Sequence, residues 1–268
     1  MRKLRLMVAM AHPDDETLGV GGTLVKYASE GVETYLVTAT RGEKGWWGAE
    51  EDYPGPTELG RIREAELLAA TQVLGVQETE FLDYVDGELD EADAEEATRR
   101  IAAAVRRFRP DVLVTFGHDG IYGHPDHIAM CQYVTAAVIR AAGDDPSLPG
   151  SPHQVAKLYY YGCTPAALAA YQAAFGDLVM HVDGAERRSP GWQDWVITTE
   201  IDTSEHWQQV WRAVSCHRSQ LPGYEKLAEL APEHHRALWG SQTYYRVFST
   251  VNGGREREHD LFAGLRTD

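Results

Sequence analysis

The stretch that decides the fold lies near the start of the chain and reads LRLMVAMAHPDDE, residues 4–16. Its first eight residues are largely apolar, which is typical of a strand buried in a parallel sheet. An imidazole and three carboxylates follow at once, at His12, Asp14, Asp15 and Glu16. Because ligands of open α/β sheets bind just outside the carboxyl ends of strands, a histidine and two aspartates at this point could hold a metal and a catalytic base together.

A second segment repeats this pattern farther along the chain. Residues 111–116, DVLVTF, predict another buried strand, and the polar run GHDGIYGHPDH, residues 117–127, follows it directly. Two strand ends that carry histidine and aspartate supply the separate segments from which a mononuclear metal site is usually assembled. The sequence therefore predicts one such site between these two loops.

Strands and helices alternate along the first half of the chain. Apolar runs predict strands at residues 4–11, 32–40, 81–84 and 111–116, and helical spacing predicts helices at residues 17–29, 57–74, 91–108 and 125–142. This alternation indicates parallel βαβ units. We therefore expect an α/β fold with a mostly parallel sheet and a ligand site at the carboxyl ends of its strands.

The second half of the chain has weaker patterns. The turn-rich stretch 143–152 is the best internal boundary, and beyond it we expect strands at 155–161 and 196–201 and helices at 165–175 and 204–215. A length of 268 residues suits one large domain. We expect a single domain over residues 1–268, in which residues 1–142 carry the motifs and residues 143–268 complete the sheet and the pocket wall.

The composition excludes several classes of protein. The net charge is −16 and no basic stripe occurs, which argues against binding to nucleic acid or to an anionic membrane surface. No apolar stretch approaches the ~20 residues of a membrane span. The 3 cysteines lie far apart and form no CxxC pair, so we expect reduced thiols in a cytoplasmic protein.

Imidazole and carboxylate ligands without thiolates suit a catalytic Zn²⁺, which takes three protein ligands and keeps one position open. The same ligands suit Fe²⁺. We predict that His12, Asp15 and His127 bind one metal ion per chain. Since consecutive side chains of an extended loop point in different directions, Asp14 would face the reacting water. The alternative is that the carboxylates at residues 14–16 cap the following helix and stabilise its dipole.

Three glycines, Gly19, Gly21 and Gly22, fall inside the helix predicted at residues 17–29. Each glycine weakens a helix by up to about 1 kcal/mol relative to alanine, so their presence suggests close approach of backbone or substrate. Their spacing is not G-x-G-x-x-G, which makes a nucleotide-binding oxidoreductase a poor match. The P-loop and the G-x-S-x-G elbow of serine hydrolases are absent from the sequence as well.

The two motifs together give the chain a family resemblance. The strings AHPDDETLG, residues 11–19, and YGHPDH, residues 122–127, are supported by TRGE at 40–43, RIREAEL at 61–67 and HRSQ at 217–220. On these residues the chain resembles the LmbE-like/PIG-L family of metal-dependent N-acetylglucosaminyl de-N-acetylases. The match runs from about residue 4 to residue 140 and is sparse beyond. The pattern is most similar to the deacetylases and amidases of the mycothiol and bacillithiol pathways.

The resemblance implies a Rossmann-like three-layer sandwich and a single zinc ion. It assigns the metal to the same three ligands that the residues themselves indicated. It further implies that Asp14 is the general base, that His124 is an acid or an electrostatic partner, and that Tyr122 lies near the oxyanion.

Other residues have expected roles with named alternatives. Asp126 would hold His124 protonated, or would instead orient a ligand histidine. Arg41 could hold a sugar hydroxyl or an anionic group, or could form a surface ion pair. Trp46 and Trp47, in the irregular loop 44–57, could stack on a sugar ring or cover the sheet edge. This loop and the C-terminal half depart from the family pattern.

The expected activity is hydrolysis of the N-acetyl group of an N-acetylglucosaminyl conjugate, a small molecule, by metal-activated water. The alternative enzyme is a metal-dependent amidase that cleaves a larger amide, such as a thiol S-conjugate. A metal- or sugar-binding protein with a degenerate site is disfavoured, because mere binding requires neither a base nor an acid. Some relatives form homo-oligomers, which leaves that state open here.

Overall fold

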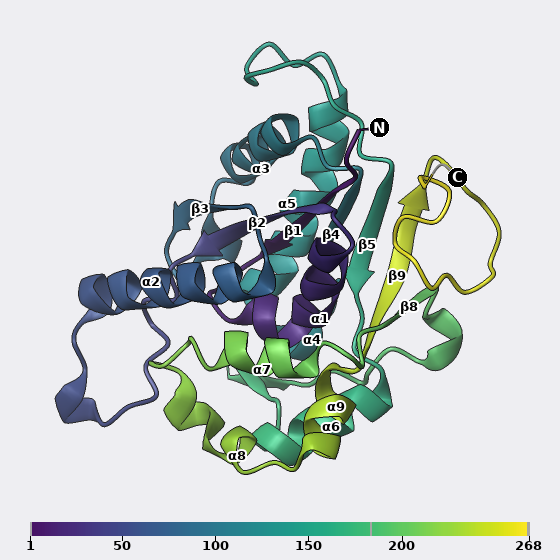
Figure 1. Ribbon diagram of the computed structural model, residues 1–268. Helices are drawn as coiled ribbons and strands as arrows, with labels where there is room; N and C mark the ends of the chain where they lie inside the picture. The colour runs from purple at the N-terminus through teal and green to yellow at the C-terminus, as the bar shows by residue number, and fades with distance from the viewer. Residues whose placement is uncertain (1, 183, 267–268) are drawn as a thin grey trace.

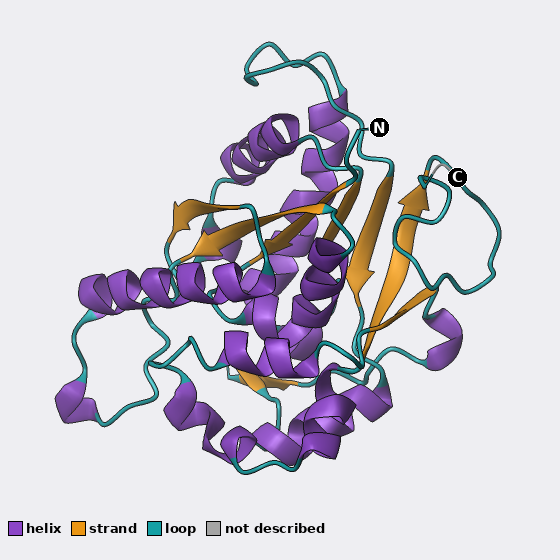
Figure 2. Ribbon diagram, viewed as in Figure 1, coloured by secondary structure: helices purple, strands orange, loops and turns teal. Residues whose placement is uncertain are grey.

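A mixed sheet between two layers of helices forms the body of the protein (Figures 1 and 2). The computed structural model describes residues 2–182 and 184–266. The sheet has the strand order β3-β2-β1-β4-β5-β9-β8. Its strands are β1 (Arg5–Met10), β2 (Glu33–Thr40), β3 (Glu78–Tyr84), β4 (Val112–Phe116), β5 (Lys157–Tyr161), β8 (Thr199–Asp202) and β9 (Ser241–Ser249).

The first five strands are parallel to one another, and β9 and β8 continue the sheet in antiparallel pairing. Helices α3 (Ala94–Phe108) and α5 (Pro125–Ala142) pack together on one face. Helices α1 (Asp15–Ser29), α2 (Pro56–Leu74) and α7 (Trp207–Val214) pack together on the other. The prediction of an α/β three-layer sandwich with a mostly parallel sheet is thus confirmed.

Burial explains why the central strands have unbroken apolar sequences. Residues 6–10 of β1 and all of β4 are buried, because helices cover both faces of the sheet. Helix α3 shows the complementary pattern. It buries Ala97, Ile101, Val105 and Phe108, which lie three or four positions apart and so share one face. Its first turn is capped by the Asp93 carboxylate, which accepts the backbone N–H of Glu96.

The order of the strands creates a crevice beside β1. From β1 the chain moves to β2 and β3 on one side, and it later places β4 and β5 on the other side. The loops that leave β1 and β4 therefore diverge at their carboxyl ends, which is where ligands bind in sheets of this kind. Both histidine-aspartate motifs follow these two strands.

The C-terminal half contributes β5, β9 and β8 to the same sheet, and its elements differ from those predicted. The strand expected at 196–201 is a 3₁₀ turn (Asp194–Val196) followed by β8. Strand β9, the hairpin of β6 (Met180–Val182) and β7 (Ala185–Arg187), and helix α9 (Pro232–Trp239) were not predicted. Helix α6 (Pro165–Phe175) begins and ends as expected. The described residues also form the short helices α4 (Gly120–Gly123) and α8 (Glu225–Ala228). Among the described residues, no helix is long and apolar enough to cross a membrane.

The three glycines of α1 differ in how closely other parts of the chain approach them. A Cβ at Gly22 would lie 2.7 Å from the Cβ of Thr203, and one at Gly21 would lie 3.2 Å from Val210. These two glycines let α1 approach the segment that contains α7. Gly19 is different, because a Cβ there would meet only the ring of Tyr161, at 3.5 Å, which is an ordinary contact.

We predict opposite effects on stability at two of these positions. Gly22→Val should lower the free energy of unfolding by about 1–3 kcal/mol, since the added methyl groups overpack against Thr203. Gly19→Ala should leave it unchanged or raise it by up to about 1 kcal/mol through helix propensity. Urea denaturation of both variants measures the difference. Equal unfolding free energies for the two variants would contradict the close approach of α1 to Thr203.

Candidate functional site

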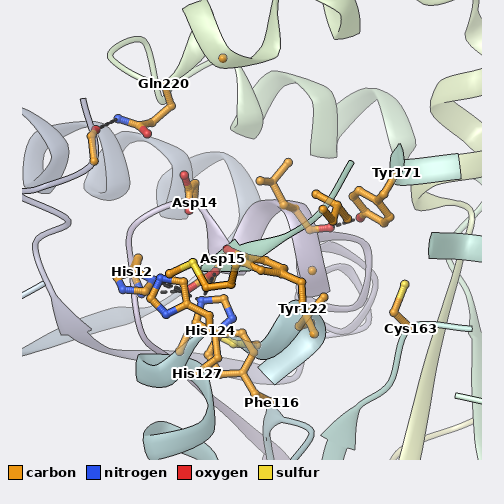
Figure 3. Close-up of a pocket in the computed structure, with 18 of the residues that line it drawn as sticks. His12, Asp14, Asp15, Phe116, Tyr122, His124, His127, Cys163, Tyr171 and Gln220 are labelled. Carbon is orange, nitrogen blue, oxygen red and sulfur yellow. Dashed lines mark hydrogen bonds and ion pairs between the residues drawn. The ribbon is translucent and has the colours of Figure 1, made fainter. Parts of the chain in front are cut away.

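A pocket of about 520 Å³ opens at the carboxyl ends of the central strands and is drawn in Figure 3. His12, Asp14 and Asp15, which follow β1, line it together with residues of the loop after β4. Those residues include Tyr122, His124 and His127. The fold thus brings together the two motifs, which lie more than a hundred residues apart in the sequence. The size is usual for a small-molecule site.

Three donor groups converge at the base of this pocket. The Nδ1 atom of His12 lies 3.2 Å from the Nε2 atom of His127. Each of these nitrogens lies 3.4 Å from an oxygen of the Asp15 carboxylate. A tetrahedral zinc ion with Zn–N distances of about 2.0–2.1 Å has ligand atoms roughly 3.3–3.4 Å apart. The separations therefore fit one small divalent cation without rearrangement.

Hydrogen bonds on the far side of each ring turn both histidines toward the same point. The Nε2 atom of His12 lies 3.0 Å from Asp126 and 3.1 Å from Asp86. The Nδ1 atom of His127 lies 3.2 Å from the carbonyl oxygen of Gly120. Because these acceptors draw the ring proton to the far nitrogen, the lone pairs of His12 Nδ1 and His127 Nε2 are left for a metal.

His12 also belongs to two other groups with the spacing of metal ligands, one with His124 and His127 and one with Asp86 and Asp126. In the group with Asp86 and Asp126, the carboxylates have other partners. The Asp126 carboxylate is fully buried and accepts the backbone N–H groups of Gly87 and Leu89, at 2.7 and 3.1 Å. Asp86 accepts the backbone N–H of Lys44 at 3.0 Å. Since these oxygens already hold hydrogen bonds and Asp126 does not line the pocket, this group is better suited to orienting His12 than to holding an ion.

The same carboxylates shape the charge of the centre. Burial lowers the pKa of His12, but hydrogen bonds that its ring donates to Asp126, Asp15 and Asp86 outweigh burial and raise this pKa well above its usual value. Burial raises the pKa of Asp15, but the neighbouring His127 and His12 outweigh it and leave the pKa lowered. The surroundings thus favour a positive charge between ionised carboxylates, as a cation site requires.

Asp14 has a strained backbone and a fixed position. Its φ is 106°, a left-handed value that side chains other than glycine rarely adopt. Its backbone N–H donates to Glu16 at 2.9 Å, and its carboxylate accepts from the buried guanidinium of Arg63 at 3.2 Å. Asp14 stands at the N-cap of α1, yet its side chain makes no capping bond. Helix capping therefore does not account for this carboxylate, and strain of this kind is concentrated at functional sites.

The expected contact between the Asp126 carboxylate and His124 is not formed. The Asp126 carboxylate binds His12, so it does not hold His124 protonated; only the backbone N–H of Asp126 reaches His124, at Nδ1, 3.2 Å away. Burial, with a further contribution from the charge of His12, lowers the pKa of His124 to about 4. His124 is therefore neutral at neutral pH and carries its proton on Nε2. Burial raises the pKa of Tyr122, so its hydroxyl also stays protonated as a donor.

Of the three predicted substrate-binding residues, the structure brings one to the pocket. Trp47 lines it. Arg41 is instead held by Glu64, at 2.6 Å, and by Asp83, so that the surface ion pair is the alternative that formed. The indole N–H of Trp46 donates to the carbonyl oxygen of Ala49 at 2.9 Å, which folds this ring onto its own loop. Neither Arg41 nor Trp46 is among the described lining residues.

Sequence reasoning missed Arg63, Asp86 and Gln220, which line the pocket. Asp86 lies two residues beyond β3, so the strand-end rule that pointed to His12 could have found it. Arg63 lies on a buried position of α2, inside the RIREAEL string at 61–67, so the family resemblance was a signal for it. Gln220, whose amide donates to the carbonyl oxygen of Gly45 at 2.9 Å, lies in the HRSQ string at 217–220, which was a signal of the same kind.

A buried ion pair supports the strained loop. His217 and Glu16 are both fully buried, and Nε2 of His217 lies 2.9 Å from Oε1 of Glu16. The other oxygen of Glu16 accepts the N–H of Asp14. Burial lowers the pKa of His217, but Glu16 outweighs this effect and the pKa is raised above 6.5. The pair thus connects the start of α1 with the segment that follows α7.

This pair predicts a pH dependence of stability. A folded pKa above the unfolded value of 6.5 gives stability that is complete below pH 6.5 and is lost as pH rises through the folded pKa of His217. The free energy of unfolding of metal-free protein should therefore decline above pH 6.5, and less steeply in His217→Gln. Part of the decline should remain in this variant, because the pKa of His12 is raised as well. Urea denaturation along a pH series tests this, with the exposed His259→Gln as control; identical slopes in wild type and His217→Gln would refute it.

Known proteins share both the sequence pattern and the fold. Residues 7–138 match the PIG-L model, described as GlcNAc-PI de-N-acetylase. A 1D-myo-inositol 2-acetamido-2-deoxy-alpha-D-glucopyranoside deacetylase of Thermobifida fusca (strain YX) is 36% identical over 247 residues, which cover 82% of this chain and 85% of that protein.

Solved structures agree. The conserved protein TT1542 of Thermus thermophilus has a TM-score of 0.66 and 26% identity, covering 93% of this chain and 97% of that one. GalB, a 4-carboxy-2-hydroxymuconate hydratase of Pseudomonas putida KT2440, has a TM-score of 0.68 and covers 94% and 99%, but at 19% identity it shows the fold alone. The motifs, the fold and the relatives agree that this chain belongs to the PIG-L (GlcNAc-PI de-N-acetylase) family.

Proposed function

We propose that this protein is a zinc-dependent hydrolase of N-acylated glucosaminyl conjugates, which in the simplest case removes the N-acetyl group from an N-acetylglucosaminyl conjugate. The observation that carries the proposal is the convergence of His12 Nδ1, His127 Nε2 and the Asp15 carboxylate beside Asp14 in one pocket. Three protein ligands and a neighbouring carboxylate are the parts of a metal-assisted hydrolytic site. The deacetylase name of the Thermobifida fusca relative supports the reaction and the amino-sugar substrate.

His12, Asp15 and His127 would hold the ion in this proposal. A bound Zn²⁺ would supply a Lewis acid that makes water more acidic and polarises the amide carbonyl. Fe²⁺ suits the same donors. Asp126 and Asp86 would act through His12, whose ring they orient.

Asp14 is the proposed general base. Its carboxylate lines the pocket, and Arg63 and Glu16 hold it by its side chain and its backbone. The carboxylate takes one proton from the attacking water, whose oxygen forms a bond to the carbonyl carbon. When the C–N bond breaks, the same proton passes to the nitrogen and leaves as part of the amine. A base fixed before the reaction loses little entropy in reaching the transition state.

Tyr122 and His124 are the proposed hydrogen-bond donors. Both side chains line the pocket, and both carry a proton at neutral pH, the hydroxyl of Tyr122 and Nε2 of His124. Donors aimed at the carbonyl oxygen stabilise the negative charge that develops there. A neutral His124 thus serves as an electrostatic partner, and proton delivery to the amine falls to Asp14.

On the substrate side, Arg63, Asp86 and Trp47 are the proposed contacts of the sugar. The guanidinium and the carboxylate suit hydroxyl groups, and the exposed indole suits a sugar face. We also infer that residues 1–268 act as one domain, since β5, β8 and β9 complete the sheet and residues after 160 line the same pocket.

The base assignment predicts the behaviour of Asp14→Asn. This variant should retain the metal and lose about 100-fold or more of kcat, because a positioned base contributes roughly 10²–10⁴-fold. Amine release from N-acetylglucosamine conjugates and elemental analysis measure the two properties on the same sample. A variant with near-wild-type kcat would remove Asp14 from the role of base.

The ligand assignment predicts the metal content. Purified wild-type protein should contain about one zinc or iron per chain, and His12→Ala and His127→Ala should lose it. The exposed His118→Ala, in the segment between β4 and α5, is the matched control and should keep it. Wild-type protein that binds no metal after reconstitution would overturn the hydrolase proposal. Unchanged content in His127→Ala would remove only that ligand.

A further inference from the structure

The pocket has two chemically different sides, which the sheet order separates. The proposed ligands His12 and Asp15 follow β1, the strand at the switch point. Loops after β2 and β3 come to the pocket from one side of β1, and loops after β4 and β5 come from the other. In Figure 3, Gln220 lies at the upper left of the view, and Tyr171 and Cys163 lie at the right, with Asp14 between them.

The side toward β2 and β3 is polar. It carries Arg63 and Asp86, which offer a guanidinium and a carboxylate, and the Gln220 amide. These groups match the hydroxyls of a sugar.

The side toward β5, here named the apolar arm, has a different character. It is built from the start of α1, the end of β5, helix α6 and the segment before β6. Its wall consists of the side chains of Leu18, Tyr161, Cys163, Tyr171, Leu178 and Met180. Of these side chains, Tyr161 and Cys163 are buried. The other four are half-buried, so part of their apolar surface is exposed in the arm.

The polar groups inside the apolar arm are uncharged and form hydrogen bonds within the protein. The hydroxyl of Tyr171 donates to the carbonyl oxygen of Leu18. Burial raises the pKa of Cys163 to about 12, so this group is an uncharged thiol. Among the described residues that line this side, Asp177 carries a carboxylate. Its side chain is 73% exposed and pairs with Arg188 at 3.6 Å, so it lies at the rim of the pocket. The interior of the arm therefore suits a hydrocarbon group.

The geometry of an amide decides which group enters the arm. A secondary amide is planar and trans, so the sugar carbon on nitrogen and the chain carbon on the carbonyl point in opposite directions. With the carbonyl at the proposed ligands and the sugar on the polar side, the acyl chain points away from the polar side. We propose that the apolar arm binds the acyl group, and that the preferred substrate is a glucosamine amide with an acyl chain longer than acetyl. This inference rests on the proposed amide hydrolysis and specifies its acyl group.

Gly19 fits this role. It lines the pocket between Leu18 and the ring of Tyr161. Because packing of α1 does not require a glycine here, unlike at Gly22, the missing side chain leaves room in the arm. A larger residue at position 19 should shorten the space available to an acyl chain.

Two substrate series test the proposal on wild-type, metal-loaded protein. One holds N-acylglucosamines with acetyl, butanoyl, hexanoyl and octanoyl groups, and the other holds alkyl glycosides of N-acetylglucosamine with matching chains. Amine release should show kcat/KM rising by up to about fourfold per buried methylene in the acyl series, until the arm is full. The glycoside series should change little. A flat or falling acyl series would overturn the proposal, and a rise confined to the glycosides would assign the arm to the aglycone instead.

A pair of variants adds a second readout. Gly19→Leu should abolish the preference for hexanoyl over acetyl. Ser29→Leu adds the same side chain at the exposed far end of α1 and should retain that preference. An undiminished preference in Gly19→Leu would contradict the assignment of the arm.

Failure of the hydrolase proposal can be distinguished from failure of the inference about the apolar arm. If no compound of either series releases amine, the proposed function fails. Calorimetric binding of the N-acylglucosamines to the same protein then decides the inference. Affinity that rises with acyl length supports the arm, and equal affinity along the series refutes it.

Discussion

The hydrogen bond between the ring of His12 and the buried carboxylate of Asp126, 3.0 Å long, connects the parts on which the site depends. Asp126 lies in the first turn of α5, His12 follows β1, and the N–H groups of Gly87 and Leu89 come from the segment after β3. A buried carboxylate without partners would cost several kcal/mol, so these three segments must stay together. The same contact turns Nδ1 of His12 toward His127.

A second set of contacts fixes Asp14 in an unfavourable backbone conformation. Arg63 contacts Asp14 from α2 and Glu16 contacts it from α1. His217, in the segment after α7, contacts Glu16 in turn. Strain of this kind persists only where surrounding groups over-determine the position. The C-terminal half thus contributes to the site in two ways, through His217 below the loop and through the walls of the pocket.

Much of the fold and the site followed from local patterns. The first four strands, the helices between them and the convergence of His12, Asp15 and His127 were predicted, because both motifs directly follow buried strands of a parallel sheet. The roles of these residues stay proposals. Strand β9 escaped prediction because it pairs in antiparallel fashion with β5 and β8, outside the parallel βαβ pattern, and no histidine-aspartate motif follows it. Of the two roles expected for Asp126, the contact with His124 was wrong and the contact with His12 formed instead, since closeness in sequence says little about where a carboxylate points.

By itself the sequence determined the order of strands and helices, the two loops that carry the chemistry and the kind of donor atoms in them. Hydrophobic periodicity and residue type are local properties, so they can be read without the fold. The tertiary structure decided which nitrogen of each histidine faces the pocket, which carboxylates stand behind His12, and that Arg41 pairs with Glu64 outside the pocket. It also decided that one side of the pocket is apolar. These features depend on contacts between residues far apart in the chain, and no local pattern encodes the direction of a side chain in space.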